Sequence, residues 1–232
     1  METICKKCIE RGEKRWNPTK TEEYKKLLGS LKWFSNVSNK NNNNTLINIA
    51  GQLQLIEFIQ QIYIDCKISD EDNWWYNEET GDNYTGDSEI ESILTKQEAC
   101  AVGAVVEAIC YTMLRHNKID FKKIEDKKTG LLKDSTEFVH MLELIEKNKL
   151  LPKDEISLCH QIRKLRNKVH LFDQIETDVE TFSRNEADLA EKCLYFLLQR
   201  WLNASDEAMQ IYFSFLPVAS KEILPGNISD FF

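Results

Sequence analysis

The sequence predicts an all-α protein, and three observations support this class. The 232-residue chain contains only 8 Gly and 4 Pro, too few for the many turns of a sandwich or barrel. Long segments are rich in Leu, Ile, Glu, Lys and Gln, which favour helices. The hydrophobic content of 42% is enough for an ordinary buried core. We therefore expect one large helical domain, or a helical domain with a substantial extension.

Two helices are predicted in the N-terminal part. Residues 21–37 place apolar side chains at helical spacing, from Tyr24 through Leu28 to Phe34. The polar, low-complexity run SNKNNNNT, at residues 38–45, predicts a break. Residues 46–66 then carry Ile and Leu on one side and Gln and Glu on the other, as expected for a helix packed against neighbours.

An acidic segment at residues 70–87 is predicted to be a long loop. Residues 69–91 contain nine Asp or Glu and no Lys or Arg, so the rest of the chain is close to neutral although the net charge is −8. The spacing of the carboxylates does not fit a calcium-binding EF-hand. Trp74, Trp75 and Tyr76 are interpreted as covering adjacent hydrophobic surface, with partner docking or autoinhibition as the alternative.

The remainder of the chain predicts five more helices. Pro152 stands in the first turn of one of them and is followed by acidic residues, an arrangement typical of a helix start. Ser183 and Glu186 form a capping box at the start of another. These helices are expected at residues 89–117, 135–148, 152–172, 185–203 and 206–216. The chain is thus divided into a helical extension with the acidic loop (1–88), a helical domain (89–216) and a tail (217–232).

No secretion or membrane signal is recognised in the sequence. The N-terminus METICKKC lacks the apolar core of a signal peptide, and the longest apolar run, residues 99–114, is interrupted by Glu107 and too short to span a bilayer. We therefore expect a cytoplasmic protein with seven reduced cysteines, mostly in the core. Cys5 and Cys8 could form half of a zinc site, but no second pair has suitable spacing, so no metal site is predicted.

The helix over residues 152–172 contains a concentration of cations around one histidine, in the stretch QIRKLRNKVHLF. At about 100° per residue, Arg163, Arg166 and His170 fall on an arc that flanks the apolar, core-facing stripe. At such half-buried positions a histidine can titrate near neutral pH and an arginine can bind phosphate with two parallel hydrogen bonds. These groups suit cleavage of a phosphodiester without a metal. The apolar stripe itself consists of Leu158, Ile162, Leu165, Val169 and Phe172.

One histidine can supply only the acid or only the base, so a two-fold dimer that joins two such helices is expected. The alternative is that the cations form a solvated helix face, with an arginine that only pairs with a buried carboxylate. Glu107, in the otherwise apolar stretch CAVGAVVEAIC, is the candidate carboxylate. It is expected either to pair with Arg166 or Arg163, or to lie on the exposed side of its helix.

The run LRNKVHL, together with the preceding AVGAVVEAIC helix and the following EADLAEKCLYFLL helix, resembles the HEPN superfamily of helical domains over residues 89–203. His170 matches the histidine of the family motif, and Arg166 with Asn167 matches its arginine and following polar residue. The motif has four to six residues between arginine and histidine. Arg166 leaves three, whereas Arg163 leaves six but is followed by lysine. Either Arg163 is the motif arginine, or this chain is a variant in which activity is altered or lost.

This resemblance implies a HEPN-like antiparallel helical bundle that forms a homodimer, with an additional N-terminal region. It further implies a metal-independent endoribonuclease of a defence or toxin system, with RNA as substrate, an antitoxin or sensor protein as a regulatory partner, and no cofactor. His170 would be the general acid or base, Arg163 and Arg166 would bind phosphate, Asn167 would orient it, and Glu107 would hold an arginine. The alternative is a non-catalytic HEPN-like module for dimerisation or for binding a protein or nucleic acid.

Overall fold

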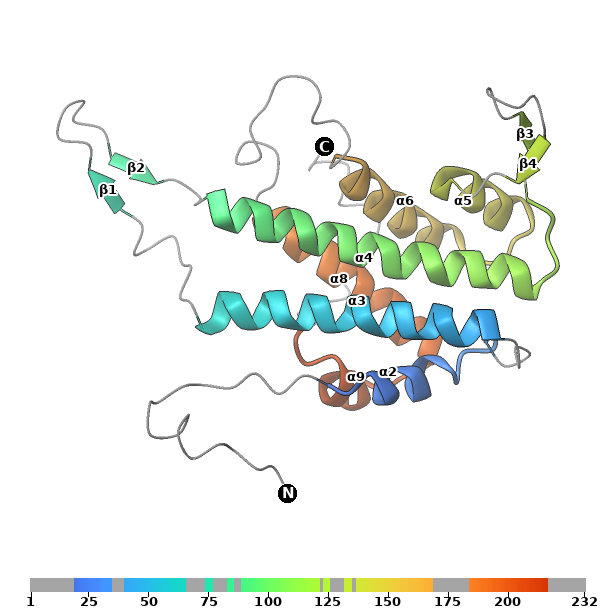
Figure 1. Ribbon diagram of the computed structural model, residues 1–232, viewed down its shortest axis with the longest axis horizontal. Helices are drawn as coiled ribbons and strands as arrows, with labels where there is room; N and C mark the ends of the chain where they lie inside the picture. Colours follow the sequence, from blue (N-terminus) through green and yellow to red (C-terminus); the bar gives the residue numbers. More distant parts are fainter. Residues whose placement is uncertain are drawn as a thin grey trace.

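In the computed structural model, most of the described residues are helical (Figure 1). Seven helices form the body of the described part, and the four short strands beside them form two hairpins. The all-α prediction is therefore confirmed for this part of the chain. The described residues are 19–34, 40–65, 74–76, 83–85, 89–121, 123–125, 132–134, 137–168 and 184–216.

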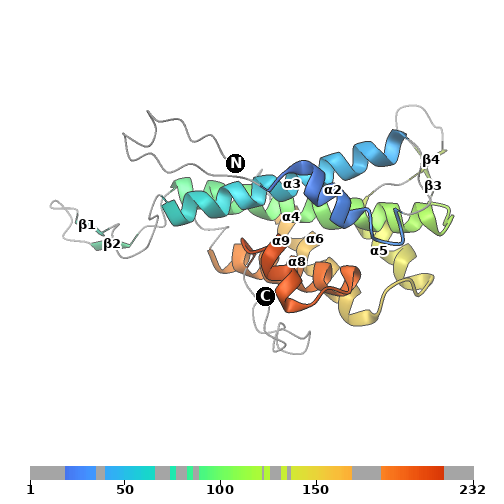
Figure 2. The same ribbon diagram turned by 90° about the horizontal axis from the view of Figure 1, so that it is seen from below.

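Helix α4 is central to the arrangement. It runs antiparallel to α3 (Figure 1) and also packs against α5, α6 and α8. Seen at right angles, α5, α8 and α9 lie on one side of the α3–α4 pair (Figure 2). The helices are α2 (Thr21–Leu28), α3 (Lys40–Asp65), α4 (Glu89–His116), α5 (Phe138–Lys147), α6 (Lys153–Lys168), α8 (Arg184–Leu202) and α9 (Asp206–Tyr212).

The hydrophobic core includes buried side chains from every one of these helices. Leu53 and Ile56 of α3 are fully buried in the same cluster as Val105 and Ile109 of α4 and Leu194 of α8. Each such side chain contributes roughly 1.5–3 kcal/mol when it leaves water. The boundary expected at residue 88 stays a prediction, but the helices on its two sides share one core.

The first helix is shorter than predicted, because α2 ends at Leu28 rather than at residue 37. Its C-cap is Gly29, and the Ser30 hydroxyl donates a hydrogen bond to the Leu27 carbonyl at 2.6 Å. Such groups stop a helix by satisfying its last carbonyls. Turns follow, and they still bury Leu31 and Phe34, which explains why the apolar spacing looked helical beyond the true end.

The break predicted at residues 38–45 is wrong over most of its length, because α3 already begins at Lys40. Asparagine has only a modest intrinsic disadvantage in helices. Once a helix is nucleated, each further residue adds a hydrogen bond at small cost, so the long packed part of α3 can extend through the asparagines.

The acidic segment predicted to be a loop and the connection expected between the helices at residues 89–117 and 135–148 each contain a hairpin. In the acidic segment, β1 (Trp74–Tyr76) pairs antiparallel with β2 (Asn83–Thr85), and Trp75 lies opposite Tyr84. Aromatic residues and threonine favour strands, a preference that the loop prediction ignored. The second hairpin pairs β3 (Lys123–Glu125) with β4 (Leu132–Asp134). The side chains of Trp74 and Trp75 lie outside the described residues, so their role stays a prediction.

The remaining helices agree with the sequence prediction apart from their ends. α5 begins at Phe138 and α9 ends at Tyr212, because Glu137 and Phe213 have non-helical backbone angles. Residues 169–172, Ser183 and the tail lie outside the described residues. Within the described part, no helix is both long and apolar enough to cross a membrane. The cysteines of this part are free thiols, of which Cys110, Cys159 and Cys193 are buried.

Candidate functional site

Helix α6 presents the predicted apolar stripe to the core. Leu158, Ile162 and Leu165 are buried, while Arg163 and Arg166 are half-buried at the edge of the stripe. Asn167 is exposed beside them. The helical periodicity therefore places the two arginines at the flank of the buried face, as the sequence predicted.

A glycine lets α6 approach α4 closely at this point. A Cβ atom added to Gly103 would lie 2.7 Å from Cδ of Arg166, closer than such atoms pack, and 3.0 Å from its Cβ, a very tight contact. The aliphatic part of Arg166 therefore lies directly over Gly103. Sequence reasoning did not single out Gly103, although an isolated glycine inside an apolar helix usually has a packing reason.

The guanidinium of Arg166 reaches the carboxylate of Glu107, one helical turn beyond Gly103. Nη1 of Arg166 lies 2.6 Å from Oε2 of Glu107, and the two side chains are 30% and 22% exposed. A charge-assisted hydrogen bond of this kind contributes roughly 1.5–3 kcal/mol. Of the two expected partners for Glu107, the structure pairs it with Arg166.

Arg163 and Arg166 line one cavity, but Arg163 is not neutralised by an ion pair with a described residue as Arg166 is. Its Nε is buried without a hydrogen-bond partner, and the described part of the chain contains no carboxylate within ion-pair distance of its guanidinium. A half-buried guanidinium whose buried Nε–H lacks a hydrogen-bond partner favours binding of an anion. The cavity measures 220 Å³ and is lined by Glu107, Glu137, Phe138, Val139, Arg163, Arg166 and Asn167.

The positive charge of Arg163 affects the pKa of its neighbour His160. Burial lowers the pKa of His160 below the usual 6.5, and the Arg163 cation lowers it further. His160 is therefore neutral at pH 7. On the other side of the site, burial raises the pKa of the Cys100 thiol, although the Arg166 cation acts in the opposite direction. Cys100 is thus a thiol rather than a reactive thiolate at neutral pH.

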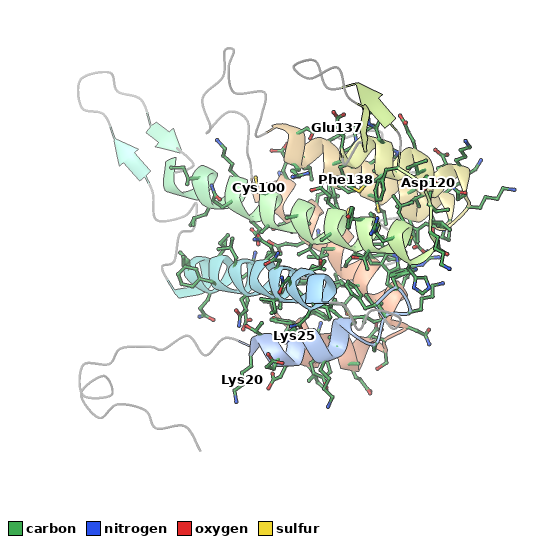
Figure 3. The ribbon with its side chains drawn as sticks, turned by 45° about the vertical axis from the view of Figure 1, so that its right-hand side comes forward. Lys20, Lys25, Cys100, Asp120, Glu137 and Phe138 are labelled. Atoms are coloured by element: carbon green, nitrogen blue, oxygen red, sulfur yellow. The ribbon has the colours of Figure 1, made fainter. Side chains whose placement is uncertain are left out.

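The start of α5 contributes a third wall that sequence reasoning missed. Glu137 and Phe138 lie there, across from the α4 segment that carries Cys100 (Figure 3). The Glu137 side chain is 64% exposed, and its Oε2 lies 3.7 Å from Nδ1 of His140. Nothing in the local sequence signals this wall, because α5 reaches the site only through tertiary packing.

The structure thus brings together four of the five residues predicted for the site. Glu107, Arg163, Arg166 and Asn167 line one cavity. The fifth, His170, lies outside the described residues, which end in this region at Lys168. Its position stays a prediction from the helical spacing.

The described residues contain no cluster of three or more His, Cys, Asp or Glu that could hold a metal ion. Cys5 and Cys8 lie outside them.

Comparisons of this chain with protein-family models, with curated proteins and with solved structures found no match. The functional interpretation therefore depends on the residues of the site alone.

Proposed function

We propose that this protein is a HEPN-like, metal-independent endoribonuclease, and that its phosphate-binding group is Arg163. The observation that carries the proposal is the contrast between the two arginines of one cavity. Arg166 is held by Glu107 at 2.6 Å, whereas the buried Nε of Arg163 has no partner among the described residues. An anion in the 220 Å³ cavity would satisfy Arg163.

This contrast favours Arg163 as the motif arginine. Arg163 leaves six residues before His170, which is within the range of the family motif, whereas Arg166 leaves three. Arg166 would then have a positioning role. Its ion pair with Glu107 would hold α6 against α4 and thereby orient Arg163. Asn167 would orient the substrate from the exposed rim.

The proposed reaction is attack of a ribose 2′-oxygen on the adjacent phosphorus. The new bond joins the 2′-oxygen to phosphorus, and the bond from phosphorus to the 5′-oxygen breaks, giving a 2′,3′-cyclic phosphate and a free 5′-hydroxyl. His170 of one protomer would accept the 2′-hydroxyl proton, and the same residue of a second protomer would protonate the leaving oxygen. Arg163 would stabilise the negative charge that develops on the phosphate.

The proposal includes a HEPN-like antiparallel bundle over residues 89–216 and a homodimer, since each protomer supplies one such histidine. It places the enzyme in a defence or toxin system, where an antitoxin or sensor protein would control it. The packing of α5, α6 and α8 on α4 supports a bundle of this kind.

The test is cleavage of single-stranded RNA by the purified full chain in EDTA. The His170→Ala variant is expected to lose roughly 100-fold or more in rate, the contribution usual for a general acid or base. His116→Ala is the matched control, because His116 ends α4 and does not line the cavity. Unchanged cleavage by the His170→Ala variant would refute the proposal.

A non-catalytic binding module is the second candidate, and one observation favours it. Glu107 and Glu137 line the cavity together with the two arginines, so the formal charges of its lining sum to zero although Arg163 has no direct ion pair with a described residue. Such a site could hold a nucleic acid or a protein without turning it over. RNA binding with no cleavage under any condition that keeps the protein folded would select this candidate.

A further inference from the structure

A second cavity adjoins the arginine cavity at Glu107. It measures 340 Å³, at the lower end of the range of about 300–1,000 Å³ that is typical of small-ligand sites. Helices α3, α4 and α5 all contribute to it. Its lining consists of Thr45, Asn48, Ala104, Glu107, Ala108, Tyr111 and Met141.

The chemistry of this cavity differs from that of its neighbour. Its single charged side chain is Glu107, and Arg166 already neutralises that carboxylate. The remaining residues supply neutral hydrogen-bonding groups or apolar surface. A phosphate would have no free cation to bind among the described residues of this cavity. An uncharged ring with polar edges could contact the apolar surface with its faces and the hydrogen-bonding groups with its edges.

Two residues of the lining have the chemistry to recognise such a ring. The amide of Asn48 makes no hydrogen bond to another described residue, and an amide can both donate to and accept from the edge of a base. Tyr111 is held in place by Phe121, with ring centroids 5.3 Å apart and planes inclined by 28°. The small side chains of Ala104 and Ala108, on the same face of α4, leave the space that a ring would occupy.

We propose that the cavity between Asn48 and Tyr111 is a nucleobase subsite, which binds the base of a nucleotide next to the phosphate held by Arg163. The inference rests on the proposed ribonuclease function and specifies its substrate: single-stranded RNA read at one base. It also gives α3 a function, since this helix supplies Asn48 from outside the segment that resembles HEPN domains. Asn48 is then a residue that determines sequence preference.

The experiment measures binding of the full chain to short fluorescent 2′-O-methyl oligonucleotides of adenine, cytosine or uracil, which cannot be cleaved. The parent is expected to prefer one base. Asn48→Ala should reduce that preference about fivefold, the usual effect of one lost hydrogen bond. Ala104→Leu, which fills the cavity from α4, should weaken binding of the preferred base as well. Asn44→Ala is the matched control, because Asn44 is exposed one turn earlier on α3 and lies outside the cavity.

The Arg163→Ala variant tests the phosphate site separately from the base subsite. Loss of a phosphate contact weakens binding of all three oligonucleotides by the same factor. If that loss is seen, but the parent shows no preference or both cavity variants keep it, the subsite is refuted and the phosphate site stands. If the parent binds no oligonucleotide, or Arg163→Ala binds as tightly as the parent, the proposed function fails and the subsite fails with it.

Discussion

At the scale of single residues, the site depends on a few close contacts that the sequence only partly predicts. The flank positions of Arg163 and Arg166 follow from helical spacing, and the pairing of Glu107 with an arginine follows from the cost of burying a carboxylate alone. Which arginine pairs with Glu107 is decided by Gly103, where α4 admits the side chain of Arg166. That choice depends on the distance between two helices, which no local pattern contains.

The Gly103→Ala substitution tests this contact. Alanine is favoured over glycine in a helix by about 1 kcal/mol, but an added Cβ only 2.7 Å from Arg166 Cδ forces a shift that costs about 1–3 kcal/mol. We therefore expect a net loss of stability in urea unfolding. Gly51→Ala is the matched control, since nothing lies within 4 Å of its added Cβ, and it should gain up to about 1 kcal/mol. Equal gains in both variants would show that α6 does not press on Gly103.

The pKa of His160 reports whether Arg163 carries an uncompensated charge. Burial and then Arg163 lower this pKa below 6.5, Lys164 acts in the same direction, and Glu146 and Glu143 oppose them. Because the folded-state pKa is the lower one, the unfolded chain takes up the proton first. Stability is therefore lost as the pH falls from about 6.5 toward the folded-state pKa.

Replacing Arg163 with glutamine should raise the His160 pKa toward 6.5 and reduce this acid loss of stability. NMR titration of the His160 ring measures the change directly. Lys147→Gln is the control, because Lys147 is exposed and is not among the charges that act on His160. A His160 pKa that does not move in the Arg163→Gln variant would mean that another group already compensates Arg163.

At the scale of helices, α6 is fixed at both ends of its described length. Near Lys168 it is held by the contact of Arg166 with Glu107, and at its start Arg200 of α8 pairs with Asp154 at 2.7 Å and Glu155 at 2.9 Å. Trp201 also donates a hydrogen bond to Glu155 at 2.9 Å. The start of α6 was predicted from Pro152 and the acidic residues that follow it. In that prediction the carboxylates interact only with the helix dipole, and their ion pairs with Arg200 were not foreseen.

Removal of the Arg200 side chain should therefore destabilise the protein. Glu155 has only 6% of its side chain exposed, so loss of its cation leaves a nearly buried carboxylate with Trp201 as its remaining hydrogen-bond partner among the described residues. We expect Arg200→Ala to cost roughly 2–3 kcal/mol in urea unfolding. Arg115→Ala should change stability by less than about 0.5 kcal/mol, because Arg115 is exposed at the end of α4 and has no ion pair with a described residue. Similar losses in the two variants would contradict this account.

Helix positions were predictable where apolar spacing and packing agree, as in α4 and α8. The predictions failed where one of these signals was absent. Polar asparagines suggested a break inside what is α3, and the apolar residues after Leu28 suggested a helix where turns bury them. In both places tertiary packing outweighed the local preference.

At the scale of the whole molecule, α2 and α3 are part of the same core as the helices after residue 88. A polar contact also crosses the interior: the amide of Gln60 on α3 donates hydrogen bonds to Glu98 on α4, at 2.7 Å, and to Glu191 on α8. All three side chains are buried. Composition shifts along the chain suggested a boundary at residue 88, but composition does not show which helices pack together.

The full chain should therefore unfold in a single cooperative transition. Far-ultraviolet circular dichroism follows all the helices. Fluorescence follows the five tryptophans of the chain, among them Trp33 and Trp201, which pack edge to face with centroids 5.6 Å apart. The two signals should give the same midpoint in urea. Two separate midpoints would mean that the N-terminal helices form an independent unit.

The central claim is that Arg163 and His170 cleave RNA without a metal, and the most direct measurement is the rate of cleavage of single-stranded RNA in EDTA. The account predicts that the parent cleaves, that His170→Ala loses roughly 100-fold or more, and that Arg163→Ala is also strongly impaired. His116→Ala should retain the rate of the parent. If the His170→Ala and Arg163→Ala variants cleave as fast as the parent, the account is contradicted.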